Sequence, residues 1–585
     1  MGTDPVMAPL TAPRSRPAIT VQRHDARAAG DHGERHARQD PHSLTGPPDS
    51  GGHLRRVARG GFFGLAGTLV TAAATLGFTV IVTHSLPDQR DAGTLFALTS
   101  AFMVAAAVIR LGAPTGLVYF LNRYRKTGHH DRIRTVWRVA YAPVVALALV
   151  VGVLGVLAAP MIASFLVGRD DPSTVLLTRV LAALLVFSAV SDLAQGSTRG
   201  YGAMRPLVLV ARVGRPGLQV GLAVVVVALG SGDLVTLGVA WAIPFVPSAL
   251  ALYWWSRRLH RAHGVSDAAP VGSAAPDGRG RTGGAHARGR AAARAAVRRE
   301  RGVFWRFTAP RTVASIAQVA VQRIDIVLLG VLAGPAAAAL YTAATRFLAF
   351  GQLGGQALNQ AIESKVASLL ALGDMGGVRT VYRTATVWLV LLAWPVYLTF
   401  IGWAPELLGI FGAGYSEAAP VIVVLSLAML LGTAVGAVDT MLVMAGRGSW
   451  TMFNASAALV INVVLNLTLI PRFGIMGAAV AWAAAIAVNN VLPLIQLGVV
   501  LRLHPFGRVS VIAAGLPLGC FLVVPWLARV FGGQVLGDGQ VVGTALGAVL
   551  YVAGLWRWRG VLELAAFTAF RRSRMTTLRR YSPAL

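Results

Sequence analysis

The sequence predicts an all-α integral membrane protein with about 14 transmembrane helices: two six-helix bundles related by a parallel pseudo-two-fold repeat, plus two extra C-terminal helices. Three observations lead to this fold class. Of the 585 residues, 55% are hydrophobic and only 13% are charged, about half the charged share of soluble domains. Apolar runs of roughly 18 or more residues recur along the chain, and each can cross about 30 Å of hydrocarbon. Short sequence patterns also recur in the two halves.

The loops between the expected spans alternate in charge. Segments such as "NRYRKTGHHDRIRTVWR" and "RLHPFGR" are basic, whereas "VGRDDPST" and "GSGD" are neutral to acidic. By the positive-inside rule, both termini are expected in the cytoplasm and the chain in the bacterial cytoplasmic membrane, as a multi-pass protein. The spans are expected near residues 61–84, 94–120, 138–160, 174–195, 207–229, 234–255, 304–332, 338–362, 384–403, 420–445, 452–470, 475–500, 509–530 and 541–557.

Composition divides the chain into six segments. The repeat is seen, for example, where Val239-Ala240-Trp241 matches Val480-Ala481-Trp482, and the low-complexity stretch "GRGRTGGAHARGRAAARAAVRRERG" separates the two halves. Such a stretch is typical of a flexible linker near anionic head groups. We expect a disordered basic cytoplasmic tail at 1–58, an N-terminal six-helix bundle at 59–256, an Arg/Ala/Gly-rich cytoplasmic linker at 257–302, a C-terminal six-helix bundle at 303–502, two additional transmembrane helices at 503–560 and a basic cytoplasmic tail at 561–585.

Several function classes are excluded or disfavoured by the residues themselves. The net charge of +29 lies in tails and alternate loops, as membrane orientation requires, so nucleic acid is not expected as a partner. Cys520 is the only cysteine, which rules out an intrachain disulfide and a thiolate metal site. No phosphate-binding loop, HExxH motif or paired carboxylate site is seen, so we expect no enzyme activity, no metal and no cofactor.

Two neighbouring spans carry polar stripes that predict a wet cavity between helices. In the seventh span, residues spaced three and four apart share one helix face. They are Arg311, Ser315, Gln318, Gln322 and Asp325. Arg323 is off this stripe and is expected to find a partner on another helix or to reach the head groups. The eighth span repeats the design with Thr345, Gln352, Gln356, Asn359 and Glu363, and Arg346 lies beside this second stripe. Interhelical hydrogen bonding is the simpler reading of single polar residues.

Further intramembrane charges accompany the stripes. The first half contributes Arg110, Asp192, Arg212 and Arg215, and the second half contributes Asp439. Arginine suits phosphate because its planar fork binds two oxygens at once, so the excess of arginine indicates an anionic substrate. A structural ion pair between Arg110 and Asp192 is the alternative for those two residues.

Three stretches carry a family resemblance. They are "QRIDIVLLGVLAGPAAAALYTAATRF", "PELLGIFGAGYSEAAPVIVVLSLAMLL" and "NVVLNLTLIPRFGIMGAAVAW". They resemble polysaccharide (O-antigen-type) flippases of the multidrug/oligosaccharidyl-lipid/polysaccharide exporter superfamily. The resemblance implies a non-enzymatic flippase that moves a polyprenyl-diphosphate-linked oligosaccharide from the inner to the outer leaflet by alternating access. By position, Asp325 matches an aspartate of the family's seventh-span motif, which implies a place on the cavity.

The resemblance also implies a substrate and partners. The substrate is a lipid-linked oligosaccharide for cell-surface polysaccharide or exopolysaccharide synthesis, membrane lipids surround the chain, and a polysaccharide polymerase or glycosyltransferases are candidate neighbours. Transport is expected to be coupled to a proton or sodium gradient or to the membrane potential, with Asp192, Asp325 and Asp439 as ion-coupling candidates. A lipid II flippase is the main alternative; a multidrug/cation antiporter and a non-transporting scaffold are weaker ones.

Overall fold

A computed structural model describes residues 50–262, 283–532 and 539–562, and within these ranges the regular structure is helical throughout, without strands. The chain divides into two compact units, residues 1–55 and 56–585, and all the contacts described below lie within the second unit. Among the described residues, twelve helical segments are long and apolar enough to cross a membrane. The predicted class, an all-α membrane protein, is confirmed.

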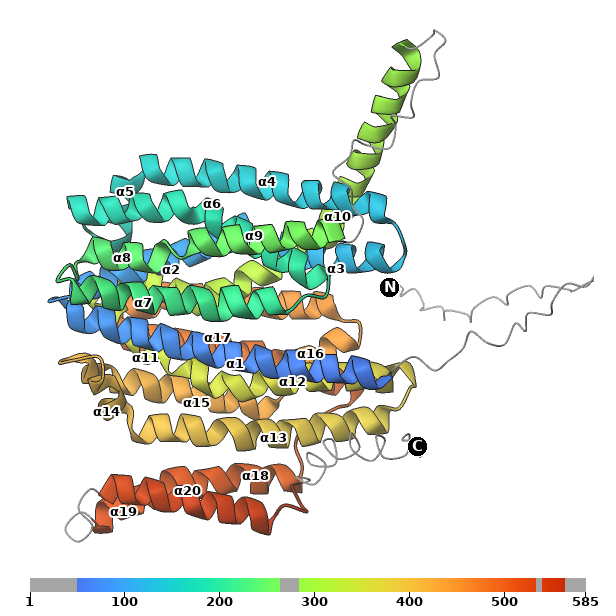
Figure 1. Cartoon of the computed structure of the whole chain (residues 1–585). Coiled ribbons are helices and arrows are strands. Elements are labelled where there is room, and N and C mark those ends of the chain that lie inside the picture. The colour runs from blue at the N-terminus through green and yellow to red at the C-terminus, as the bar shows by residue number, and fades with distance from the viewer. Residues whose placement is uncertain (1–49, 263–282, 533–538, 563–585) are drawn as a thin grey trace, which may run out of the picture. The chain divides into compact units, whose positions relative to one another are not determined.

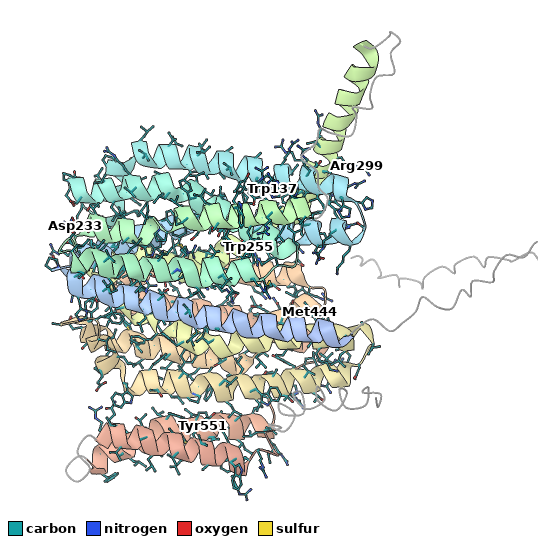
Figure 2. The ribbon with its side chains drawn as sticks, viewed as in Figure 1. Trp137, Asp233, Trp255, Arg299, Met444 and Tyr551 are labelled. Atoms are coloured by element: carbon teal, nitrogen blue, oxygen red, sulfur yellow. The ribbon has the colours of Figure 1, made fainter. Side chains whose placement is uncertain are left out.

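In Figure 1 the long helices run side by side across the view. We call the left end, with the turns at 86–91, 168–171, 230–233 and 403–418, the acidic end, and the right end, with the turns at 123–132, 199–206, 372–379 and 502–508, the basic end. Asp233 lies at the acidic end, whereas Arg299 and Met444 lie toward the basic end (Figure 2).

The first half of the chain forms ten helical elements. They are α1 (Ser50–Ser85), α2 (Gln89–Ile109), α3 (Ala113–Lys126), α4 (His130–Leu157), α5 (Ala159–Val167), α6 (Pro172–Gly200), the π-helix η1 (Leu207–Gly214), α7 (Arg215–Ala228), α8 (Leu234–Ala242) and α9 (Phe245–Ala262). The expected second span is broken near Arg110, because Leu111 and Gly112 both adopt positive φ, at 47° and 63°, and end α2 before α3 begins.

The second half and the C-terminal pair follow. Their elements are α10 (Gly283–Leu332), α11 (Pro335–Arg346), α12 (Leu348–Ala371), α13 (Met375–Gly402), α14 (Ala404–Gly409), the 3₁₀-helix η2 (Tyr415–Ala418), α15 (Ala419–Val435), α16 (Val438–Met444), α17 (Gly448–Leu501), α18 (Arg508–Leu518), the π-helix η3 (Gly519–Val523), α19 (Val524–Gly532) and α20 (Gly539–Arg557).

The number of spans stays a prediction. The expected eleventh and twelfth spans both lie in α17, which is interrupted at Gly474, where φ is 54° and ψ is −130°. The expected eighth span corresponds to α11 and α12, which are separated at Phe347 and are not among the twelve apolar candidates. The glutamines and the asparagine of the expected eighth span lower its mean hydropathy, as expected for a span with a polar stripe.

Part of the expected linker is helical. Residues 283–302 form the first turns of α10, which leave the bundle at the basic end, where Arg299 lies (Figure 2). Ala and Arg have high helix propensity, so this composition favours a helix although it lacks a hydrophobic stripe. Residues 263–282 of the linker, residues 1–49 of the expected tail and residues 563–585 lie outside the described residues.

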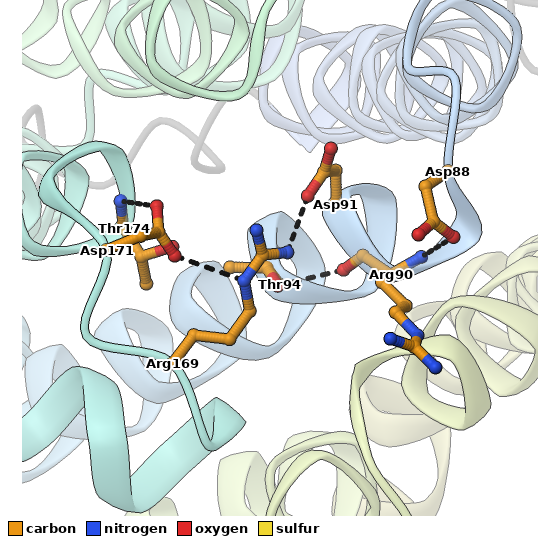
Figure 3. Close-up of polar contacts among 7 residues, drawn as sticks. All are labelled: Asp88, Arg90, Asp91, Thr94, Arg169, Asp171 and Thr174. Carbon is orange, nitrogen blue, oxygen red and sulfur yellow. Dashed lines mark hydrogen bonds and ion pairs between the residues drawn. The ribbon is translucent and has the colours of Figure 1, made fainter.

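At the acidic end the two halves pack closely. A Cβ added at Gly93 of α2 would lie 1.7 Å from the carbonyl oxygen of Pro335 in α11, so only glycine allows this approach. Nearby, Gln89 Nε2 donates a hydrogen bond to the Ala413 carbonyl at 3.2 Å. Figure 3 shows Arg169 bridging Asp91 at 2.6 Å and Asp171 at 3.1 Å, which joins α2 to the loop before α6. The first two contacts join the two halves at this end, and the Arg169 bridge fixes α2 within the first half.

The C-terminal helices pair through small residues. Gly543 and Gly547 of α20 face α19 and η3, and a Cβ at Gly547 would lie 1.9 Å from the Cys520 carbonyl oxygen. Tyr551 in turn donates a hydrogen bond to the Leu391 carbonyl at 2.6 Å, which fastens α20 to α13. Such glycine spacing lets helix backbones approach closely in a membrane, where packing rather than hydrophobicity drives association.

Candidate functional site

A cavity of about 480 Å³ lies among α1, α10, α11, α12, α16 and α17. It therefore has one wall from the first half of the chain and the others from the second half. Its polar or charged lining residues are Thr68, Thr71, Thr75, Gln318, Gln322, Arg323, Asp325, Thr345, Arg346, Gln352, Asp439, Thr451 and Asn489. Predicted residues from both polar stripes thus line one cavity.

The α1 wall is a row of threonines. Thr68, Thr71 and Thr75 are spaced three and four apart and share one face, and their hydroxyls donate to carbonyls one turn back at 2.7–2.9 Å. A hydroxyl that donates to its own helix needs no other partner and keeps its lone pairs for neighbours. Sequence reasoning missed this wall, although the threonine spacing was visible.

Arg212 supports the threonine wall from outside the cavity. Its Nη1 donates to Thr68 Oγ1 at 3.0 Å and to the Gly64 carbonyl at 2.8 Å, and its own carbonyl, 2.7 Å from Thr71 Oγ1, shares that hydroxyl's one proton with the Gly67 carbonyl. Arg212 lies in η1, where the Arg215 N–H bonds the Val210 carbonyl five residues back. Such π-turns misalign the backbone ladder and often occur at functional sites.

Asp325 is the most enclosed charge of the cavity. Its side chain is 2% exposed, its Oδ2 accepts a hydrogen bond from Tyr341 at 2.7 Å, and its Oδ1 has no partner among the described residues. Asp439 likewise has a buried Oδ1 without a described partner. An unsatisfied buried acceptor costs about 1–3 kcal/mol, so both carboxylates can accept a proton, a cation or a donor from substrate.

Two arginines face the same space. Arg346 donates from Nε to Thr79 at 3.1 Å and lies over the Phe96 ring at 5.8 Å, contacts that position it from the first half. Arg323 makes no hydrogen bond or ion pair with any residue that the structure describes. Arg323 was expected to find a partner on another helix or to reach the head groups, but it lines the same cavity as Asp325, which a long side chain two residues away along the helix can reach.

Other predicted residues are not among the described residues that line this cavity. Arg110 forms an ion pair with Asp192 at 3.5 Å, and both side chains are about one quarter exposed, at 25% and 23%. Arg215 lies 4.6 Å from the Phe245 ring centre, and Arg311 lies 3.9 Å from that of Phe307. The remaining two are Asn359, which has a buried Oδ1 without a described partner, and Gln356, whose side chain lies outside the described ones.

The asparagines of α17 are also buried. Asn462 is fully buried and neither of its amide atoms has a described partner, while Asn466 donates to the Asn462 carbonyl at 2.8 Å. Asn454 and Gln496 exchange two hydrogen bonds of 2.8 Å, which join the two arms of α17. The Asn454–Gln496 pair is structural, whereas the side-chain amide of Asn462 retains unused hydrogen-bonding capacity in the interior of the second half.

Comparisons with known proteins agree with this arrangement. A family model described as polysaccharide biosynthesis protein matches residues 57–362, and a MatE model matches residues 310–468. The chain is 26% identical over 181 residues to the Haloferax volcanii protein described as "Probable low-salt glycan biosynthesis flippase Agl15". That match covers 31% of this chain and 38% of the relative's length.

Solved transporter structures show the same fold. The lipid II flippase MurJ, in an inward closed conformation, superposes with a TM-score of 0.58 at 10% identity, over 84% of this chain and all of that one. An inward-facing MATE family multidrug resistance transporter of the MOP superfamily gives 0.55 at 15% identity, over 74% and 94%. The family model spans about half of the residues. The chain belongs to the polysaccharide biosynthesis protein family.

Proposed function

We propose that the protein moves a polyprenyl-diphosphate-linked oligosaccharide from the inner to the outer leaflet by alternating access. In this proposal the basic end faces the cytoplasm, as the positive-inside rule favours. The diphosphate and sugars cross within the cavity while the polyprenyl chain stays in lipid. The glycan serves cell-surface polysaccharide synthesis.

The cavity arginines are the observation that carries this proposal. Arg346 is 11 residues from the start of α11 and Arg323 is 9 from the end of α10, so at about 1.5 Å per residue both lie roughly 14–17 Å from the acidic end. That is near the middle of a bilayer about 30 Å thick. A charge there costs roughly 2.5–3.5 kcal/mol on insertion scales, and a diphosphate offsets that cost in the loaded state.

The carboxylates supply a means of coupling. Among the described lining residues, Arg323 and Arg346 are matched by Asp325 and Asp439, so the empty cavity has no excess of formal charge. When a proton or sodium ion occupies a carboxylate, the arginines are unopposed and attract the anion. Release of the cation then weakens anion binding. Outward movement of each negative charge is also downhill by about 2.3 kcal/mol per 100 mV in an inside-negative cell.

The test is transport in proteoliposomes that contain a fluorescent polyprenyl-diphosphate oligosaccharide. Arg323→Ala and Arg346→Ala should each slow outward movement at least tenfold, because a point charge that meets the diphosphate is lost. Arg311→Ala is the matched control on α10, since Arg311 stacks on Phe307 and does not line the cavity. Equal transport by all three variants and the unaltered protein would disprove the proposal.

The choice of cargo separates the alternatives. Lipid II shares the diphosphate, so equal transport of lipid II and of oligosaccharide lipids that lack a peptide would make the arginines a general diphosphate site. Transport of lipid II alone would support the peptidoglycan alternative. A cationic dye expelled in exchange for protons, with no lipid movement, would indicate a multidrug antiporter.

A further inference from the structure

A second hollow lies at the basic end, on the far side of α13 from the substrate cavity. Its volume is about 280 Å³, and it is formed by the start of α13, the start of α18 and the segment after α20. The residues that matter here are Thr380, Arg383, Val387, Arg508, Ser510 and Leu562. We call it the α13–α18 cleft.

The charge in this cleft has one sign. Arg383 and Arg508 both line it, and none of its described lining residues is acidic. Arg383 lies against His504, with Nη2 at 3.1 Å from Nε2 and Nε at 3.4 Å from the carbonyl, so no acidic group among the described lining residues compensates its charge. The cleft is therefore an anion site by composition.

The cleft also has an apolar side. Val387 of α13 and Leu562, after α20, form this side. Trp388 donates from Nε1 to the Leu562 carbonyl at 3.2 Å. Residues Thr380 to Val387 lie 5 to 12 positions into α13, roughly 8–18 Å from its first residue. The cleft therefore extends from the basic end toward the hydrocarbon, and its apolar residues lie on the deeper side.

These features together favour an amphipathic anion over a free one. Basic pockets between transmembrane helices on the cytoplasmic side bind the phosphate head groups of anionic lipids. We propose that the α13–α18 cleft binds the phosphate head group of an anionic phospholipid from the cytoplasmic leaflet, with an acyl chain along Val387. The lipid would fasten the α18–α20 pair to α13, beside the Tyr551–Leu391 hydrogen bond. This site is independent of the proposed glycan transport.

The experiment is lipid binding to the purified full chain, followed by native mass spectrometry and thermal unfolding. Cardiolipin or phosphatidylglycerol should stay bound and raise Tm, whereas phosphatidylcholine should not. Arg383→Ala with Arg508→Ala should weaken anionic lipid binding at least tenfold. Arg379→Ala is the matched control, because Arg379 is exposed on the same helix and does not line the cleft.

Three outcomes would overturn the proposal. They are unchanged lipid binding in the double variant, equal binding of phosphatidylcholine, and displacement of the lipid by millimolar inorganic phosphate, which would make the cleft a free-phosphate site. If the double variant is unstable, the single variant Arg508→Glu tests the same site, because Arg508 is exposed and tolerates a polar replacement. Its loss of lipid binding with unchanged Tm in lipid-free detergent is the expected result.

Discussion

Replacement of Gly93 by alanine should open the acidic end of the protein. A Cβ at this position would lie 1.7 Å from the Pro335 carbonyl oxygen and 2.4 Å from its carbon. Ordinary contacts of this kind are about 3.4 Å or longer, so α2 and α11 must part by roughly 1.7 Å. Both atoms of Pro335 belong to the backbone, so no side-chain rotation relieves the clash.

The energies of overpacking and of helix propensity together indicate that Gly93→Ala disfavours the closed acidic end. Overpacking of this kind costs about 1–3 kcal/mol, whereas glycine to alanine in a helix recovers about 0.5–1 kcal/mol. The net penalty falls on the conformation in which α2 and α11 touch. The net penalty is at most about 2.5 kcal/mol, and at about 1.4 kcal/mol per factor of ten the closed acidic end should lose up to about 60-fold in population relative to an open one.

Crosslinking measures this shift. In a Cys520→Ala background, Gln89→Cys and Ala413→Cys place two thiols where a 3.2 Å hydrogen bond now joins the halves. Crosslink yield should be high with Gly93 and low with Gly93→Ala. Gly77→Ala is the control, since a Cβ there meets nothing within 4 Å. Equal yields for Gly93→Ala and Gly77→Ala would refute the reasoning.

Three further results are expected. Asp192→Asn should lower Tm only slightly, because a quarter-exposed ion pair with Arg110 contributes about 1 kcal/mol or less. Loss of export by Arg110→Ala at unchanged Tm would contradict a purely structural role for Arg110. Burial acts to raise the pKa of Asp171, but hydrogen bonds from Thr174 and the charge of Arg169 outweigh it and lower the pKa. The stabilisation is therefore present above the ordinary value of about 3.9 and lost as pH falls below it, so Asp171→Asn should flatten the dependence of Tm on pH between about 5 and 3. Gly547→Ala should detach α20 from η3 and speed proteolysis of the C-terminal pair, whereas Gly515→Ala, with open space around it, should not.

The fold class followed from the sequence because its signals are local. Apolar runs of membrane length, alternating loop charge and the density of glycine are readable one segment at a time. The same holds for the stripe of Gln318, Gln322 and Asp325, since helix periodicity places residues three and four apart on one face. Local periodicity does not reveal where helices break inside an apolar run, and so the interruptions at Leu111 and Phe347 were not predicted, whereas that at Gly474 falls between the expected eleventh and twelfth spans.

Partners across helices were decided by the tertiary structure alone. Arg110 and Asp192 are far apart in the sequence, which left cavity residues and a structural ion pair as alternatives, and only the packing of α2 against α6 decided for the ion pair. Arg323 joins the cavity because a long side chain reaches beyond the face that its Cα occupies. The sequence by itself determined that charges lie inside the membrane; the packing of helices decided which charges neutralise each other and which line a cavity, because distance in space, not spacing in the chain, sets electrostatic energy.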